Sequence, residues 1–128
     1  MLRLILILPL LLNTCQKDES ISAYADTGAI YALQEFQGGP LAATIAFPER
    51  GTVRGGGPCN TYSASQTVPY PWIQLERFAA TKRACPDLNI ETAFFTALQS
   101  MTLVEVSGDV VILSNDTGEE LVFHAIQD

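Results

Sequence analysis

The sequence predicts an α+β fold: a small, curled antiparallel sheet, in the form of a meander or partial barrel, with one main amphipathic helix. Two patterns support this prediction. Short apolar or alternating stretches, separated by Gly, Pro, Asn and Asp, recur along most of the chain, as expected for strands joined by tight turns. One longer stretch instead has apolar residues at helical spacing. Strands, one helix and then more strands are typical of the α+β class.

Four strands are expected before the helix, at residues 30–35, 41–47, 52–55 and 72–78. The second has the clearest alternation, which predicts one shared face for Leu41, Ala43, Ile45 and Phe47. The fourth strand follows two prolines, which do not fit inside a central strand and so mark its start.

The helix is expected near residues 90–101, where one apolar stripe is formed by Ile90, Ala93, Phe94, Ala97, Leu98 and Met101. Asp87 or Asn89 can cap its N-terminus, and Glu91 lies where the helix dipole favours a negative charge. Three further strands, at residues 102–106, 110–113 and 120–126, are separated by tight turns and complete an antiparallel meander.

The length of the chain indicates how many domains it forms, and its net charge excludes some classes of binding partner. The chain has 128 residues, which suits one domain after a short leader. Its formal net charge of −7 argues against binding to DNA, RNA or anionic lipid, because those partners require basic patches. We expect a monomer that binds no nucleic acid and carries no metal or other cofactor.

Residues 1–12 contain one positive charge followed by an apolar run. The run is far shorter than the ~20 residues that span a bilayer, and the pattern is typical of a secretory signal peptide. A buried N-terminal strand or helix is the alternative.

Cys15 directly follows this run, in the sequence LNTC, which resembles the lipobox of bacterial lipoproteins. The resemblance implies cleavage before Cys15, lipidation of its thiol and a membrane anchor, although Asn13 and Thr14 depart from the usual small residues. Gln16 rather than Asp then implies an outer-membrane location facing the periplasm. An ordinary signal peptide, which would leave Cys15 free or remove it, is the alternative. The expected organisation is a signal peptide (1–14), a tether (15–26) and a domain (27–128).

Cys59 and Cys85 are the other two cysteines, and both lie beside prolines in irregular segments. In an exported chain an isolated pair is expected to form a disulfide. The alternative is two buried thiols. The spacing contains no CxxC, so neither a redox motif nor a zinc site is indicated.

The sequence offers no catalytic residue. Its only histidine, His124, lies on one face of the last expected strand, without the partners that a triad or a metal site requires. Acidic residues are plentiful, so an enzyme that uses two carboxylates is kept as a further alternative.

Several motifs resemble those of the META/HslJ family. They are GGGPCNTY at residues 55–62, TKRACP at 81–86, the helical residues Glu91, Phe94 and Leu98, and the closing strands at 106–113 and 118–123. The chain departs from the family pattern at Tyr31, Pro58, Ser65 and Arg83. The resemblance implies a bacterial envelope lipoprotein linked to heat-shock or stress phenotypes, with no defined biochemical activity.

We therefore expect a non-enzymatic envelope lipoprotein that binds something at the membrane face, either an envelope protein or a small apolar ligand in the concavity of the sheet. A chaperone- or inhibitor-like module that docks on another exported protein is the alternative.

Overall fold

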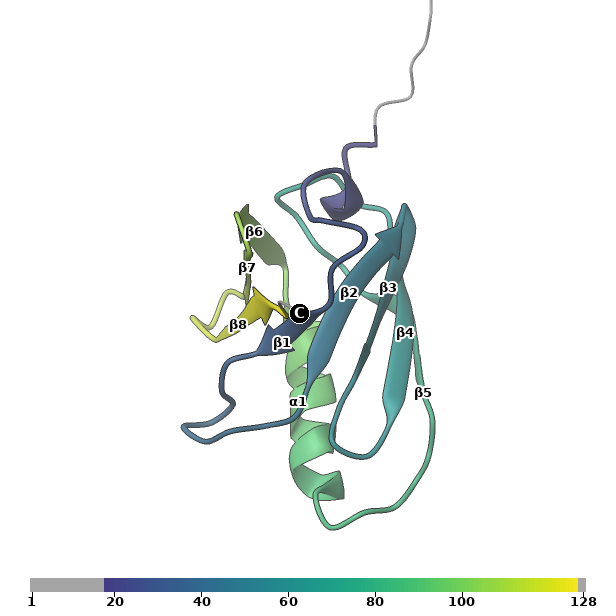
Figure 1. Ribbon diagram of the computed structural model, residues 1–128, viewed down its shortest axis with the longest axis vertical. Helices are drawn as coiled ribbons and strands as arrows, with labels where there is room; N and C mark the ends of the chain where they lie inside the picture. Colours follow the sequence, from purple (N-terminus) through teal and green to yellow (C-terminus); the bar gives the residue numbers. More distant parts are fainter. Residues whose placement is uncertain (1–17, 127–128) are drawn as a thin grey trace, which may run out of the picture.

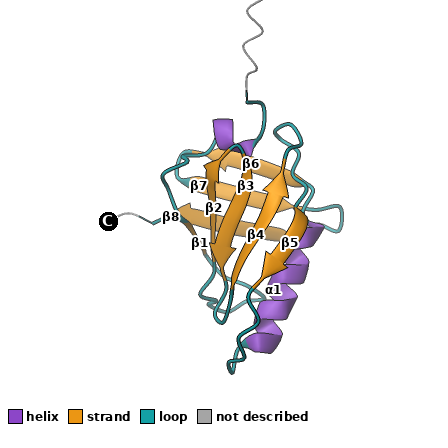
Figure 2. Cartoon of the chain, turned by 90° about the vertical axis from the view of Figure 1, so that its right-hand side faces the viewer, coloured by secondary structure: helices purple, strands orange, loops and turns teal. Residues whose placement is uncertain are grey.

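Eight antiparallel strands form one curled sheet, against which an α-helix packs, in the computed structural model (Figures 1 and 2). The structure describes residues 18–126. In chain order the elements are η1 (Ile21–Ala23), β1 (Tyr31–Leu33), β2 (Thr44–Glu49), β3 (Gly51–Gly56), β4 (Thr61–Gln66), β5 (Glu76–Ala80), α1 (Leu88–Ser100), β6 (Leu103–Ser107), β7 (Val110–Ser114) and β8 (Glu120–Ala125). The strands lie in the order β5-β4-β3-β2-β1-β8-β7-β6. The predicted α+β class, with a sheet curled into a half-barrel, is confirmed.

The short strand β1 joins two meanders into one sheet. It pairs with β2 on one side and with β8 on the other, so that Tyr31 lies opposite both Ile45 and Ala125. Strands β2 to β5 form the first meander, and β6 to β8 form the second.

The outer edge of β6 is covered by the segment that precedes β5. Ile73 N–H donates to the Thr102 carbonyl (3.0 Å), and Val104 N–H donates to the Pro71 carbonyl (2.8 Å). Unpaired backbone groups at a sheet edge favour pairing with other chains, so these bonds protect the edge.

The core fills the inner face of the curled sheet. Ala43, Ile45 and Phe47 are buried there, as their alternation predicts, whereas Leu41 is only partly buried. The helix contributes Phe94, Ala97, Leu98 and neighbouring residues, and Figure 2 shows it beside β5. Within residues 18–126, no helix combines the length and apolarity needed to cross a bilayer.

Strand β4 is absent from the sequence prediction. Tyr62 and Ala64 alternate inward as expected for a strand, but the next inward position is the polar Gln66, which is only 1% exposed. Its side chain donates to the Val68 carbonyl (2.8 Å) and accepts from Gln74 N–H (2.9 Å). Because this buried glutamine forms its hydrogen bonds with backbone groups, a polar residue stands at an inward position and interrupts the apolar alternation that would have predicted the strand.

Two other predicted boundaries are corrected. The strand expected at 72–78 begins only at Glu76, because the backbone before it bonds to residues 102–104 and to the Gln66 side chain rather than to the backbone of β4. The helix begins at Leu88 with Asp87 at the N-cap, but the Asp87 side chain makes no capping hydrogen bond.

Part of the segment expected to be a tether packs against the domain. Residues 15–17 lie outside the described residues, but Ser20, Ile21 and Ser22 are buried in the domain, with Ile21 only 2% exposed. Asp18 accepts hydrogen bonds from the side chains of Ser20 and Ser22. Partial burial raises the pKa of Asp18, but these bonds and nearby Arg50 outweigh it and hold that pKa below its usual value.

Replacing the buried residue of this segment tests its role. Ile21→Ala is expected to lower the free energy of unfolding by about 2–5 kcal/mol, because it removes buried methyl groups and leaves a cavity. Ile30→Ala is the matched control, since Ile30 is 52% exposed, and its effect is expected to stay within about 0.5 kcal/mol. Chemical denaturation measures both. Equal effects would show that residues 20–25 are a tether after all.

Candidate functional site

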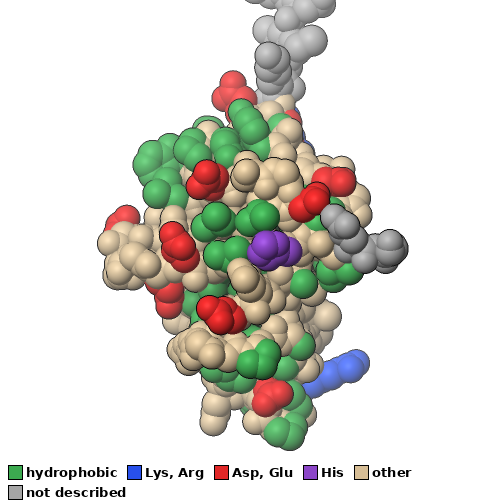
Figure 3. Space-filling model, turned by 60° about the vertical axis from the view of Figure 1, so that its left-hand side comes forward, with side chains coloured by type: hydrophobic (Ala, Val, Ile, Leu, Met, Phe, Trp, Pro, Cys, Tyr) green, Lys and Arg blue, Asp and Glu red, His purple; other side chains and the backbone are tan. Residues whose placement is uncertain are grey.

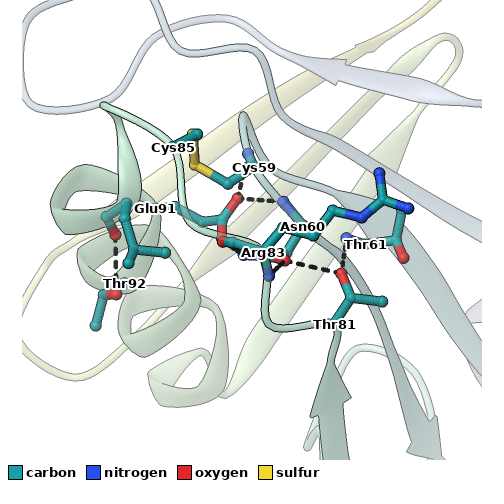
Figure 4. The surroundings of a disulfide bond; sticks show 9 residues. Cys59, Asn60, Thr61, Thr81, Arg83, Cys85, Glu91 and Thr92 are labelled. Carbon is teal, nitrogen blue, oxygen red and sulfur yellow. Dashed lines mark hydrogen bonds between the residues drawn. A yellow bond between two sulfur atoms is a disulfide. The ribbon is translucent and has the colours of Figure 1, made fainter.

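Glu91 binds the turn between β3 and β4 (Figure 4). It lies in the first turn of α1 and is 1% exposed. Its Oε2 accepts the backbone N–H groups of Cys59 (2.6 Å) and Asn60 (2.7 Å), and its Oε1 accepts from the Asn60 side-chain amide (2.6 Å). A buried carboxyl group is tolerated only when hydrogen-bonded, and here both oxygens have partners.

Asn60 continues this network toward the segment after β5. Its Oδ1 accepts from Arg83 N–H (2.6 Å) and from the Thr81 hydroxyl (2.9 Å), while its Nδ2 also donates to the Arg83 carbonyl (3.1 Å). Thr81 in turn accepts from Thr61 N–H (3.1 Å). One buried asparagine therefore fixes residues 81–83 against the start of β4.

A disulfide closes the same region, between Cys59 and Cys85, as expected from the sequence. The two cysteines are 26 positions apart and their Cα atoms are 5.7 Å apart. Closing a loop of this length contributes about 3–4 kcal/mol to stability in the chain-entropy model. Cys15, the predicted lipidation site, lies outside the described residues.

Two glycines make room for this arrangement. A Cβ at Gly57 would lie 2.6 Å from Glu91 Oε2, so any side chain there would displace the carboxyl group. A Cβ at Gly55 would overlap both the Thr44 carbonyl oxygen and the hydroxyl of Tyr62, which donates to that carbonyl (2.7 Å). Burial raises the pKa of Tyr62, which keeps this hydroxyl protonated.

The sequence placed these residues in three separate motifs, and the structure brings them together. Glu91 lies in the first turn of α1, as expected, but the sequence analysis missed its second role: its carboxyl group bonds to a turn 31 positions away. A sequence signal existed: Glu91 lies three and seven positions before Phe94 and Leu98, and so belongs to the buried face of the helix.

The inner concavity of the sheet, where a small apolar ligand is expected from the sequence, holds the hydrophobic core, including buried residues of α1. His124 is exposed on the opposite face of β8. Within the described part of the chain, no group of three or more His, Cys, Asp or Glu side chains is placed to hold a metal ion.

A hollow of about 590 Å³ lies instead on the outer face of β2 to β5. Ala46, Ser63 and Ala79 line it and alternate along their strands with inward-facing residues. Their small side chains leave the space open. Arg54, which is exposed on β3, is the only charged residue among the lining residues.

The Asn60 network forms one wall of this hollow. Thr61 and Thr81, which the network joins, both line the hollow. A second hollow of about 370 Å³ lies on the other side of residues 80–84 and reaches Glu91 and Phe95 on α1. The residues of the Glu91 and Asn60 network therefore determine the shape of the outer surface as well as the packing of the helix.

Glu91→Gln is expected to lower the free energy of unfolding by at least about 2 kcal/mol. The substitution replaces one acceptor oxygen by an NH₂ group, which leaves buried donors without a partner. Glu105→Gln on the exposed side of β6 is the control and is expected to change stability by less than about 0.5 kcal/mol. Thermal or urea unfolding compares the two, and equal losses would contradict the role given to Glu91.

Gly57→Ala is expected to lower stability by about 1–3 kcal/mol, since the new methyl group overlaps the Glu91 carboxyl group. The amide NMR signals of Cys59 and Asn60 are expected to shift with it. At Gly39 a Cβ would meet no atom within 4 Å, so Gly39→Ala is the matched control. Unchanged Cys59 and Asn60 signals in Gly57→Ala would contradict the close approach.

Solved structures share this fold at low sequence identity. An NMR structure of a protein from Burkholderia xenovorans matches with a TM-score of 0.61 and 19% identity, covering 78% of this chain and 83% of that one. A second NMR structure matches with a TM-score of 0.59 and 18% identity, covering 75% and 87%. A crystal structure of a DUF4847 family protein from Bacteroides vulgatus ATCC 8482 matches with a TM-score of 0.51 and 19% identity, covering 67% and 61%. These likenesses concern the fold alone.

A search of curated proteins found no match. The family model of the META domain, however, matches residues 27–128, which include every residue of the Glu91 network and both cysteines of the disulfide. The chain belongs to the META domain family.

Proposed function

We propose that this chain is a non-enzymatic binding domain of the bacterial cell envelope, anchored through a lipid on Cys15 and related to HslJ-like stress proteins. The signal-like residues 1–12 and the lipobox resemblance support export and anchoring. The Cys59–Cys85 disulfide supports an oxidising compartment, because such bonds persist there and are rare in reducing cytosol.

The hollow around Arg54 is the observation that carries the binding role. Its volume of about 590 Å³ falls in the range of small-molecule sites. Arg54 forms no ion pair with any acidic side chain among residues 18–126; the ion pair found there joins Arg50 to Asp18 (3.8 Å). An unpaired guanidinium beside alanine and threonine side chains suits a small amphiphilic ligand with an acidic group and an apolar body.

The lining residues favour binding over catalysis. The hydroxyl groups of Thr44, Thr61, Ser63 and Thr81 border the hollow, but no histidine or carboxylate does. A hydroxyl without an adjacent base is a weak nucleophile, and it serves better as a hydrogen-bonding group.

A chaperone- or inhibitor-like module stays the alternative. It would use a face the size of a protein interface rather than this hollow, and binding of a folded exported protein without competition from small carboxylates would favour it.

NMR titration with decanoate tests the hollow. The amide signals of Ala46, Ser63 and Ala79 are expected to shift, because these residues line the hollow. Arg54→Gln is expected to weaken binding about tenfold, the loss expected for one charge-assisted hydrogen bond. Arg77→Gln is the control, since Arg77 is exposed on neighbouring β5 and does not line the hollow.

Decanol, which has the same chain without the charge, is expected to bind as weakly to the native protein as decanoate binds to Arg54→Gln. Equal decanoate binding by the native protein and Arg54→Gln would remove the anion-binding role. If none of the amide signals of the outer face shifted, the hollow would not be a binding site for this class of ligand.

A further inference from the structure

Two large aromatic side chains are exposed on two neighbouring segments: Tyr24 follows η1, and Trp72 lies two positions after Tyr70, whose N–H donates to the Glu19 carbonyl. Tyr24 is 53% exposed and Trp72 is 56% exposed, while Ile21, close to Tyr24 in the chain, is buried. The Tyr24 ring stacks on Tyr70, with ring centroids 4.0 Å apart. Figure 3 shows hydrophobic side chains gathered near the end of the molecule where the described chain begins. We call Tyr24, Tyr70 and Trp72 the aromatic end.

The backbone holds this aromatic end in place. Tyr70 N–H donates to the Glu19 carbonyl (2.6 Å), and the Tyr70 hydroxyl accepts from Val106 N–H (3.0 Å). Trp72 N–H donates to the Pro69 carbonyl (2.8 Å), and Trp72 forms an isolated bridge with Leu103 at the edge of β6. Tyr70 and Trp72 therefore belong to a segment that is fixed by both the N-terminal residues and the sheet, and Tyr24 stacks on this segment through Tyr70.

The chain between this end and Cys15 is short. Asp18, the first described residue, is three positions after Cys15, a span of at most about 11 Å when fully extended. Since residues 20–22 pack into the domain, a lipid on Cys15 would hold the aromatic end close to the bilayer surface.

The side chains of the aromatic end are of the kind that concentrates in the headgroup region of a bilayer. Tyrosine and tryptophan concentrate there, because their rings are apolar and their OH and NH groups can bond to water and headgroups. Asp18, Glu19 and the net charge of −7 oppose binding to anionic lipid, so the expected partner is a surface of zwitterionic lipid.

We propose that the aromatic end docks on a zwitterionic lipid surface and so fixes the orientation of the domain on the membrane. This inference rests on the lipid anchor of the proposed function.

Trp72 is the only tryptophan of the chain, so its fluorescence reports on this end directly. The full chain, expressed with its leader and extracted from membranes, is reconstituted into phosphatidylcholine–phosphatidylethanolamine vesicles. Docking predicts that Trp72 emission moves to shorter wavelength, is shielded from iodide and loses most of its intensity when the phosphatidylcholine is brominated.

A relocated tryptophan is the control. Leu88, at the start of α1, is 38% exposed, and Figure 1 places this end of the helix opposite η1. In Trp72→Phe/Leu88→Trp, iodide is expected to quench the new tryptophan and brominated lipid is not. Tyr24→Ser is expected to reduce quenching of Trp72 by brominated lipid without reducing retention on the vesicles.

The outcomes separate the anchor from the docking. A chain that floats with the vesicles while Trp72 stays open to iodide would overturn the docking and leave the anchor intact. A chain that does not float would overturn both. Equal lipid quenching at positions 72 and 88 would also overturn the docking, because it would show no preferred orientation.

Discussion

The contact between the Glu91 carboxyl group and the β3–β4 turn is the constraint on which the rest of the structure depends. A carboxyl group that is 1% exposed would be strongly destabilising without partners, and three hydrogen bonds from Cys59 and Asn60 supply them. These bonds require α1 to begin close to the turn. They also require Gly57 to lack a side chain. The position of the only long helix in the described chain is therefore set by a polar contact, while the hydrophobic core supplies most of the stabilising burial.

The disulfide and Asn60 reinforce that contact in different ways. The Cys59–Cys85 bond limits how far the turn and the start of the helix can separate, but it does not set the direction of the backbone between them. Asn60 sets that direction through its bonds to Arg83 and Thr81. Because Thr81 also lines the outer hollow, residues that would be judged purely structural in this region determine the shape of a candidate binding surface.

The sequence predicted those features that depend on local pattern. The alternation at Ala43, Ile45 and Phe47 and the helical stripe through Phe94 and Leu98 were sufficient for the fold class, because burial follows the period of each element. The sequence did not predict strand β4, because the polar Gln66 occupies one of its inward positions and bonds there to backbone groups. The sequence did not predict the contact of Glu91 with Asn60, because the two residues are 31 positions apart and a periodic pattern reports only on contacts within one element.

The polar N-terminal residues show the same limitation with a larger consequence. Ser20 and Ser22 suggested a solvated tether, yet their hydroxyls bond to Asp18 and both residues are buried. Composition cannot distinguish a serine that faces water from one that satisfies a neighbouring carboxylate. A long tether would let the domain turn freely above a membrane. With Ile21 in the core, about 11 Å of chain at most separates Cys15 from Asp18, so under the proposed anchor this end of the domain stays close to the membrane. Under the proposed anchor and docking, the direction in which the Arg54 hollow faces is therefore set by the fold together with the contact between the aromatic end and the membrane.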